Sequence, residues 1–95
     1  MKKQMYVVRT NYAGVFFGEI KRRDGDEVTM RNVRKLWCWD GACGVEQLAA
    51  DGVQNPAKCK FTVVVKEMII LGVNQILPCT DKATKSLGDV AIWRR

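Results

Sequence analysis

The sequence of 95 residues contains no histidine and only one serine, Ser86. A serine or cysteine nucleophile is commonly activated by a neighbouring histidine, so the usual Ser-His and Cys-His arrangements cannot be built within one chain. No glycine-rich loop of the P-loop or dinucleotide-binding type is present either. We therefore expect a protein that is not an enzyme and that carries no cofactor.

The cysteines lack the spacing of a metal or redox site. Cys38, Cys43, Cys59 and Cys79 form no C-x-x-C pair, and no histidine could complete a zinc site with them. Two disulfides are the other alternative, but nothing in the sequence indicates a secreted protein. We expect free, mostly buried thiols and no metal.

Long hydrophobic runs are also missing. The longest, "FTVVV" and "MIILGV", fall far short of the roughly 20 residues that a membrane helix needs. The basic start "MKKQMYVVRT" is interrupted by Arg9 and has no small-residue cleavage site after it, so it does not resemble a signal peptide. We expect no membrane span and a location in the cytoplasm.

Positive charge, by contrast, is plentiful. Sixteen Lys and Arg residues against ten Asp and Glu residues give a formal net charge of +6. Such a balance raises affinity for polyanions. Nucleic acid, nucleotides and acidic proteins are therefore the candidate partners.

The residue pattern predicts a single domain over residues 1–95 of the α+β class, with about five mostly antiparallel strands in one sheet and two short helices. The expected strands cover residues 5–10, 15–23, 28–39, 60–66 and 67–79. Asp24-Gly25 suits a tight hairpin turn. The apolar face of the third strand changes parity near Arg31-Asn32, which predicts a β-bulge there. Gly72 indicates a further bulge or a close backbone approach.

The two helices are expected after Trp39 and after Cys79. Asp40 would cap the first and Gly52 would end it, whereas Thr80 would cap the second and Gly88 would stop it. The tail, residues 89–95, either docks through Ile92 and Trp93 or hangs loose.

The stretch from Arg31 to Trp39 sets cations directly before two tryptophans. Alternate side chains of an extended chain share a face, so Trp37 and Trp39 would stand in one row with Lys35 and Arg31. Arginine holds phosphates bidentately and an aromatic ring stacks on a base. With Arg34 added, this pattern indicates a nucleotide site.

Packing alone also explains the same stretch. Val33 and the two tryptophans would then contact the first helix, while the cations face solvent. Both explanations hold if one tryptophan is buried and the other exposed. A second cluster of similar chemistry, Arg9 with Tyr12, precedes Gly14, where a turn is the stronger explanation.

Three segments carry a family resemblance: "YAGVFFGEI", "RNVRKLWCWDGACGVEQLAADGV" and "ILPCTDKA". They resemble a family of small, uncharacterised phage and prophage proteins with a G-V-x-x-G strand, an Arg-rich strand that ends in an aromatic pair, and an L-A-x-x-G helix end. The resemblance extends over residues 6–93 and implies no particular activity.

A more distant similarity, in "GVFFG" and from "VRKLWCW" to "LAADGV", is to the phage Thoeris anti-defence sponge proteins. The similarity implies a small oligomer that sequesters a cyclic nucleotide signal of bacterial immunity without cleaving it. It extends to Arg31, Arg34, Trp37 and Trp39 as ligand-binding residues.

These observations together predict a phage-encoded, non-enzymatic protein that sequesters a nucleotide-type immune signal in the host cytoplasm. The predicted ligand-binding residues are Arg31, Arg34, Lys35, Trp37, Trp39, Arg9 and Tyr12. We also expect a dimer or a higher even-numbered oligomer, because two short helices cover little of the apolar strands. The alternatives are a basic DNA- or RNA-binding accessory protein and a protein inhibitor of a host enzyme.

Overall fold

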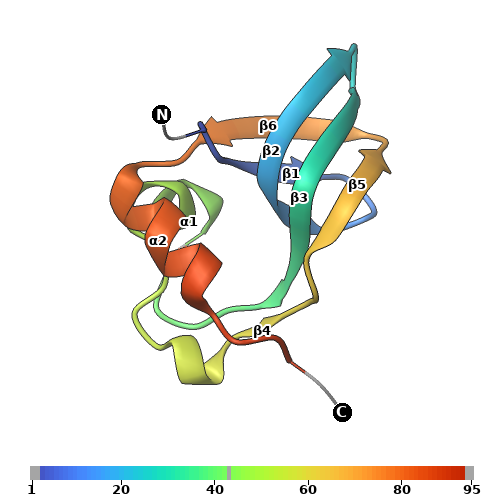
Figure 1. Cartoon of the computed structure of the whole chain (residues 1–95). Helices are drawn as coiled ribbons and strands as arrows, with labels where there is room; N and C mark the ends of the chain where they lie inside the picture. Colours follow the sequence, from blue (N-terminus) through green and yellow to red (C-terminus); the bar gives the residue numbers. More distant parts are fainter. Residues whose placement is uncertain (1–2, 43, 94–95) are drawn as a thin grey trace.

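The computed structural model describes residues 3–42 and 44–93 (Figure 1). Its elements in chain order are β1 (Tyr6–Thr10), β2 (Val15–Asp24), β3 (Glu27–Cys38), α1 (Val45–Asp51), the 3-10 turn η1 (Pro56–Lys58), β4 (Lys60–Phe61), β5 (Val65–Ile70), β6 (Val73–Pro78) and α2 (Asp81–Asp89). The strands form one six-stranded sheet whose strand pairs are all antiparallel. The predicted α+β class is confirmed.

The long strand β3 organises the sheet. One edge of β3 pairs with β2, while its other edge pairs with β5 near its start and with β4 near its end. β2 then pairs with β1, and β1 with β6. The sheet bends so strongly that β1 and β6 cross behind β2, β3 and β5, as Figure 1 shows.

The predicted β-bulge is present at Asn32. Phe17 pairs with Arg34 and Glu19 pairs with Arg31, so β3 contains one more residue than β2 between these two pairs. Asn32 has a φ of 49°, the only positive value among the described residues other than glycine. Because of the extra residue, the side chain of Val33 points into the apolar cluster that also contains Met30.

The two faces of the sheet bury separate apolar clusters. One lies between the sheet and the two helices, where Leu36 of β3 packs with Leu48 of α1 and Leu87 of α2. The other lies inside the curve of the sheet and contains Val8, Val28, Met30, Val33 and Ile70. Both helices therefore lie on the same side of the sheet (Figure 1).

The start of α1 differs from the prediction. Its N-cap is Gly44, and no side chain caps the helix. Asp40 lies five residues before the first residue of α1 and instead accepts a hydrogen bond from Asn55 at 3.1 Å. The expected end is confirmed, since Gly52 has a φ of 77° and its N–H donates to the carbonyl of Leu48.

The start of α2 follows the prediction, because the Thr80 hydroxyl accepts a hydrogen bond from the N–H of Ala83 at 3.1 Å. Its end does not. Gly88 lies inside the helix, which continues to Asp89. The hydroxyl of the single serine, Ser86, bonds to both the N–H and the carbonyl of Val53, and thereby ties α2 to the segment after α1.

The division of residues 60–79 into two strands was wrong. The expected boundary between Lys66 and Glu67 falls inside β5, and the chain turns at Gly72, whose φ is 71°. β4 is a separate strand of two residues. Lys66 and Glu67 interrupt two apolar runs and so resemble a break between strands, but both are exposed residues inside β5.

The tail docks on β4 over its described residues, which end at Trp93. Ile92 forms a parallel bridge with Phe61, and the N–H of Trp93 donates to the Phe61 carbonyl at 3.0 Å. Cys38, Cys59 and Cys79 are free thiols, of which Cys38 is exposed. Cys43 lies outside the described residues.

Candidate functional site

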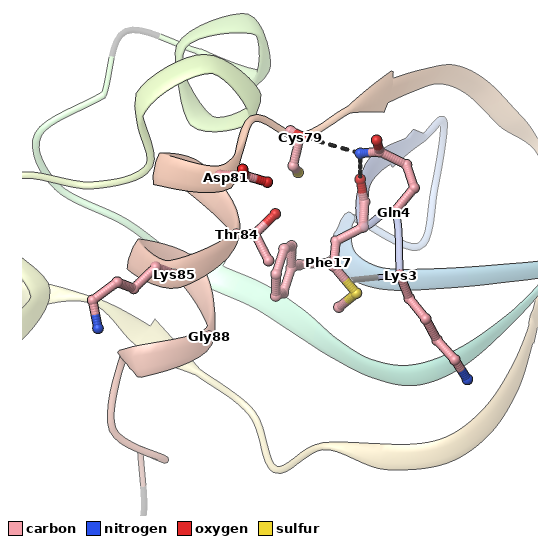
Figure 2. A pocket seen from close by; sticks show the side chains of 9 residues that line it. Lys3, Gln4, Phe17, Cys79, Asp81, Thr84, Lys85 and Gly88 are labelled. Carbon is pink, nitrogen blue, oxygen red and sulfur yellow. Dashed lines mark hydrogen bonds between the residues drawn. The ribbon is translucent and has the colours of Figure 1, made fainter. Parts of the chain in front are cut away.

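An open hollow of about 570 Å³ lies between α2 and the start of β1. Met5, Phe17 and Cys79 give it apolar walls. Figure 2 shows the Asp81 carboxylate and the Thr84 hydroxyl pointing into it from α2. The hollow therefore joins an apolar surface to polar groups that can bind the edge of a ring.

Local hydrogen bonds hold the two sides of this hollow together. The Gln4 amide donates to the carbonyl of Met5 at 2.7 Å and to that of Cys79 at 2.9 Å (Figure 2). The N–H of Cys79 donates to the carbonyl of Met5 at 2.8 Å. The Thr80 hydroxyl, which caps α2, also donates to the carbonyl of Ala50 at 2.6 Å. These bonds position the first turn of α2 beside β1.

A second hollow, of about 640 Å³, is lined by charged and polar side chains. Lys3, Arg31 and Lys66 line it together with Asn32 and Glu67. We call this hollow the cationic groove. Three cations face one carboxylate in it, so the cationic groove suits an anion. Lys3 lines both hollows, which are therefore adjacent.

The carboxylates near the cationic groove are ionised. The hydrogen bond from Asn32, 2.6 Å long, holds the pKa of Glu19 below its ordinary value, and the nearby Lys3 lowers it further. The hydrogen bond and charge of Lys21 lower the pKa of Glu67, and Arg31 adds to the effect. Glu19 pairs with Lys3, and Glu67 pairs with Lys21 and Arg31. With Lys66, four cations stand against these two carboxylates, so the groove stays cationic overall.

The Cys79 thiol, which lines the first hollow, is not an activated nucleophile. Burial raises the pKa of the Cys79 thiol to about 11, so the thiol is protonated at neutral pH. A protonated thiol is a poor nucleophile. Among the residues that the structure describes, no group of three or more metal-ligating side chains is found.

Of the predicted binding residues, only Arg31 lines the cationic groove. Its Nε lies 3.8 Å from the Glu67 carboxylate, and its side chain is half exposed. The bulge at Asn32 separates Arg31 from the following residues of the row, because the extra residue moves Val33 to the opposite face. The single row of cations and tryptophans expected from the sequence is therefore not formed.

Arg34 is buried, and its position is structural. Only 3% of the residue is exposed. Its Nε donates to the carbonyl of Thr62 at 3.0 Å, and its Nη1 donates to the carbonyls of Leu87 and Val90 at 3.3 and 2.8 Å. Burial lowers the pKa of the guanidinium, which also lies over the Phe61 ring. Arg34 thus binds the main-chain carbonyls at the end of α2 and does not line the cationic groove.

The two tryptophans separate, as one of the sequence interpretations allowed. Trp39 lies beyond the end of β3 and packs, half-buried, against the cluster beneath the helices. Trp37 is 53% exposed and contacts Trp93. Lys35 is half-buried and its side chain runs past Gly14. None of these three residues lines either hollow.

The second predicted cluster also lies elsewhere. The Arg9 guanidinium donates to the Gln75 side chain at 3.3 Å. Tyr12 is 98% exposed, in a turn that the Thr10 hydroxyl stabilises by accepting from the N–H groups of Ala13 and Gly14. Tyr12 thus lies in the turn that the sequence favoured, whereas Arg9 belongs to β1.

The sequence interpretation missed most of the residues that line the two hollows. Lys3, Lys66, Asp81 and Thr84 are single polar residues with no motif around them. Only the basic pair at the start of the chain was a signal, and it was interpreted for targeting alone. Folding brings these residues together from the two ends and the middle of the chain.

The fold and the site define a small α+β protein with a cationic groove beside a partly apolar hollow. The chain belongs to the family described as Domain of unknown function (DUF6948), whose model matches residues 3–87. Comparison with curated proteins gave no match, and comparison with solved structures gave none either. No described helix is long and apolar enough to cross a membrane.

Proposed function

We propose that this protein is a non-enzymatic binding protein that sequesters a nucleotide-type ligand. The observation that carries the proposal is the junction of the two hollows at Lys3. Nucleotides combine a planar, partly apolar ring with anionic phosphates, and the two hollows offer matching surfaces for these parts. Their volumes of about 570 and 640 Å³ are in the range of small-molecule sites.

The phosphates would bind in the cationic groove, where Arg31 and Lys66 can both donate charge-assisted hydrogen bonds. The ring would lie in the first hollow against Phe17, with Asp81 and Thr84 at its polar edge. The Asp81 carboxylate would repel a phosphate, which favours this orientation of the ligand over the reverse. Lys3 would contact the ligand between its two parts.

Sequestration is the proposed outcome because the residues around the site offer no activated nucleophile. The similarity to the Thoeris anti-defence sponge proteins supports the same outcome and suggests a cyclic nucleotide immune signal as the ligand. In this proposal the protein acts for a phage, in the cytoplasm of the host cell, and lowers the concentration of that signal.

Self-association is part of the proposal. Tyr12, Phe16, Ile69 and Leu71 line a shallow hollow of about 400 Å³ whose lining residues are all uncharged. Apart from Phe16, these side chains are exposed. Two copies with a net charge of +6 repel each other least where they meet through an uncharged patch. We propose that a second copy covers this patch.

Isothermal titration calorimetry with a panel of linear and cyclic nucleotides tests the binding, and mass spectrometry of the protein purified from phage-infected cells identifies a retained ligand. Arg31→Ala and Lys66→Ala should each weaken binding by about 1.5–3 kcal/mol, the contribution of a hydrogen bond to a charged group. Lys58→Ala is the matched control, since Lys58 is exposed on η1 and lines neither hollow.

Binding of no nucleotide in the panel, together with a ligand-free preparation, would contradict the proposal. Equal losses in Lys58→Ala and Arg31→Ala would show that general charge, not the groove, attracts the ligand. Salt provides a further check. A small ligand neutralises few charges, so its affinity should fall less with salt than that of a nucleic acid that contacts many cations.

A further inference from the structure

Three segments that are distant in the sequence lie side by side at the end of the molecule opposite the β2–β3 hairpin tip (Figure 1). The end of β3 pairs with β4 through Leu36 and Phe61, and the tail pairs with β4 through Phe61 and Ile92. Leu36 and Phe61 are buried beneath the helices. Side chains alternate along extended segments, so Trp37 and Lys60, next to Leu36 and Phe61, point to the outside. Trp93 of the tail, which is partly exposed, lies against them there.

These three outward side chains contact one another. The ring centroids of Trp37 and Trp93 lie 4.9 Å apart with an angle of 59° between their planes. The Lys60 ammonium lies 5.5 Å from the Trp37 centroid and 5.2 Å from the Trp93 centroid. We call this arrangement the Trp37–Lys60–Trp93 face.

Core packing does not account for the Trp37–Lys60–Trp93 face. Trp37 remains 53% exposed and Trp93 37% exposed, although a buried tryptophan would contribute far more to stability. Lys60 forms no salt bridge within residues 3–42 and 44–93. Two ring surfaces and one cation, which has no carboxylate partner among the described residues, are thus presented to solvent together.

We propose that the Trp37–Lys60–Trp93 face binds single-stranded nucleic acid. Unpaired bases stack on exposed tryptophan rings, and a lysine beside the rings can pair with the phosphate that joins two bases. The net charge of +6 draws a polyanion to the molecule as a whole. A duplex keeps its base faces stacked inside the helix and offers the rings nothing to stack on.

The charge at this face favours a nucleic acid over a protein partner. Exposed tryptophans also serve as anchors in protein interfaces, but there they fill apolar pockets from which water is excluded. An ammonium held over both rings would have to lose its water in such a pocket, at a large energetic cost. Against a phosphate backbone the same ammonium gains a partner.

Fluorescence anisotropy of labelled decathymidylate tests the proposal, with intrinsic tryptophan fluorescence as a second readout. The oligonucleotide should bind and quench the tryptophan signal. Trp37→Ala and Trp93→Ala should each lower the affinity about tenfold, in keeping with the loss of one stacked base. Trp37→Phe should restore part of it, because phenylalanine keeps a stacking surface.

One matched control and one further variant isolate the face. Trp39→Phe changes a tryptophan that is half-buried away from the face and should leave the affinity unchanged. Lys60→Ala should reduce the slope of log affinity against log salt by about 0.7, the value for one phosphate contact with a single strand. Thermal melts of each variant show whether it is folded.

Absence of quenching, or equal affinity in folded Trp37→Ala and Trp93→Ala proteins, would overturn the proposal, as would binding of a ten-base-pair duplex with the same affinity. Loss of decathymidylate binding only in Arg31→Ala and Lys66→Ala would place the polymer in the cationic groove instead. Because the face shares no residue with the two hollows, nucleotide titrations succeed or fail independently of this test.

Discussion

At the scale of single residues, the guanidinium of Arg34 links the end of α2 to the segment after β4. It supplies donors to three main-chain carbonyls that helix and strand geometry would otherwise leave unpaired. Its Nη2 is buried and has no hydrogen-bond partner within the described part of the chain. A buried cation is held here by carbonyl dipoles.

Arg34→Ala should therefore lower the free energy of unfolding by about 3 kcal/mol, since it leaves buried carbonyls unpaired and opens a cavity. Urea denaturation followed by circular dichroism measures this loss. Arg34→Lys keeps the charge but not the fork of donors, so it should recover only part of the stability. An unchanged midpoint in Arg34→Ala would show that the three hydrogen bonds contribute nothing.

The contribution of Cys79 to stability depends on pH. Burial raises the pKa of its thiol from 9.0 to about 11, so the folded protein keeps a proton that the unfolded chain releases. The folded state keeps its full stability below pH 9, where the thiol is protonated in both the folded and the unfolded state. This part of the stability is lost as the pH rises towards 11.

The free energy of unfolding should thus fall between pH 9 and pH 11, through Cys79 by about 2–3 kcal/mol at most. Denaturation at a series of pH values measures it, and Cys79→Ala should flatten the curve over this window. Lysines and tyrosines titrate in the same range, so the difference between the two proteins is the relevant quantity. Parallel curves would contradict the prediction.

At the scale of elements, the bulge in β3 decides what each side chain of that strand faces. Asn32 adopts a φ of 49° and its side chain donates to Glu19 across the strand pair. Asparagine tolerates this left-handed region better than other residues with a side chain, and β-branched residues tolerate it least.

Asn32→Val should consequently destabilise the protein by about 1–3 kcal/mol, the cost of a strained backbone conformation. Asn32→Gly permits the same φ and loses only the side-chain hydrogen bond, so its effect should be smaller. Thermal denaturation of the two variants gives the comparison. A glycine variant less stable than the valine variant would mean that the hydrogen bond, not the backbone, maintains the bulge.

At the scale of the whole molecule, charged and uncharged surfaces are separate. The cationic groove is lined by charged and polar side chains, whereas the patch around Tyr12, Ile69 and Leu71 contains no charge. Under the proposed function, the anionic ligand and the second copy of the protein would therefore use different surfaces.

Light scattering coupled to size-exclusion chromatography should report a dimer or a higher even-numbered oligomer at micromolar concentration. Ile69→Asp and Leu71→Asp would place a charge in the patch and should shift the protein towards the monomer. Val63→Asp is the control, because Val63 is an exposed apolar residue outside the patch. A monomeric wild-type protein would remove self-association from the proposal.

Local patterns in the sequence were sufficient for the fold class. Alternating apolar residues predict antiparallel strands, the change of parity near Asn32 predicts the bulge, and Thr80 predicts the start of α2. Each of these features depends on the backbone preferences of a few neighbouring residues, so a short window of sequence contains the necessary information. The bounds of β5 were missed because Lys66 and Glu67, the charged residues that interrupt the apolar run, are exposed residues within the strand and do not mark its end.

The site was decided only by the tertiary structure. Arg34 and Arg31 have the same side chain and are three residues apart, yet one is buried against the end of α2 and the other lines the cationic groove. Which of the two is buried depends on the extra residue at Asn32 and on where α2 ends. Likewise Lys3 and Lys66 line one groove because the bent sheet brings the start of the chain beside β5. Long-range packing of this kind leaves no trace in the spacing of neighbouring residues.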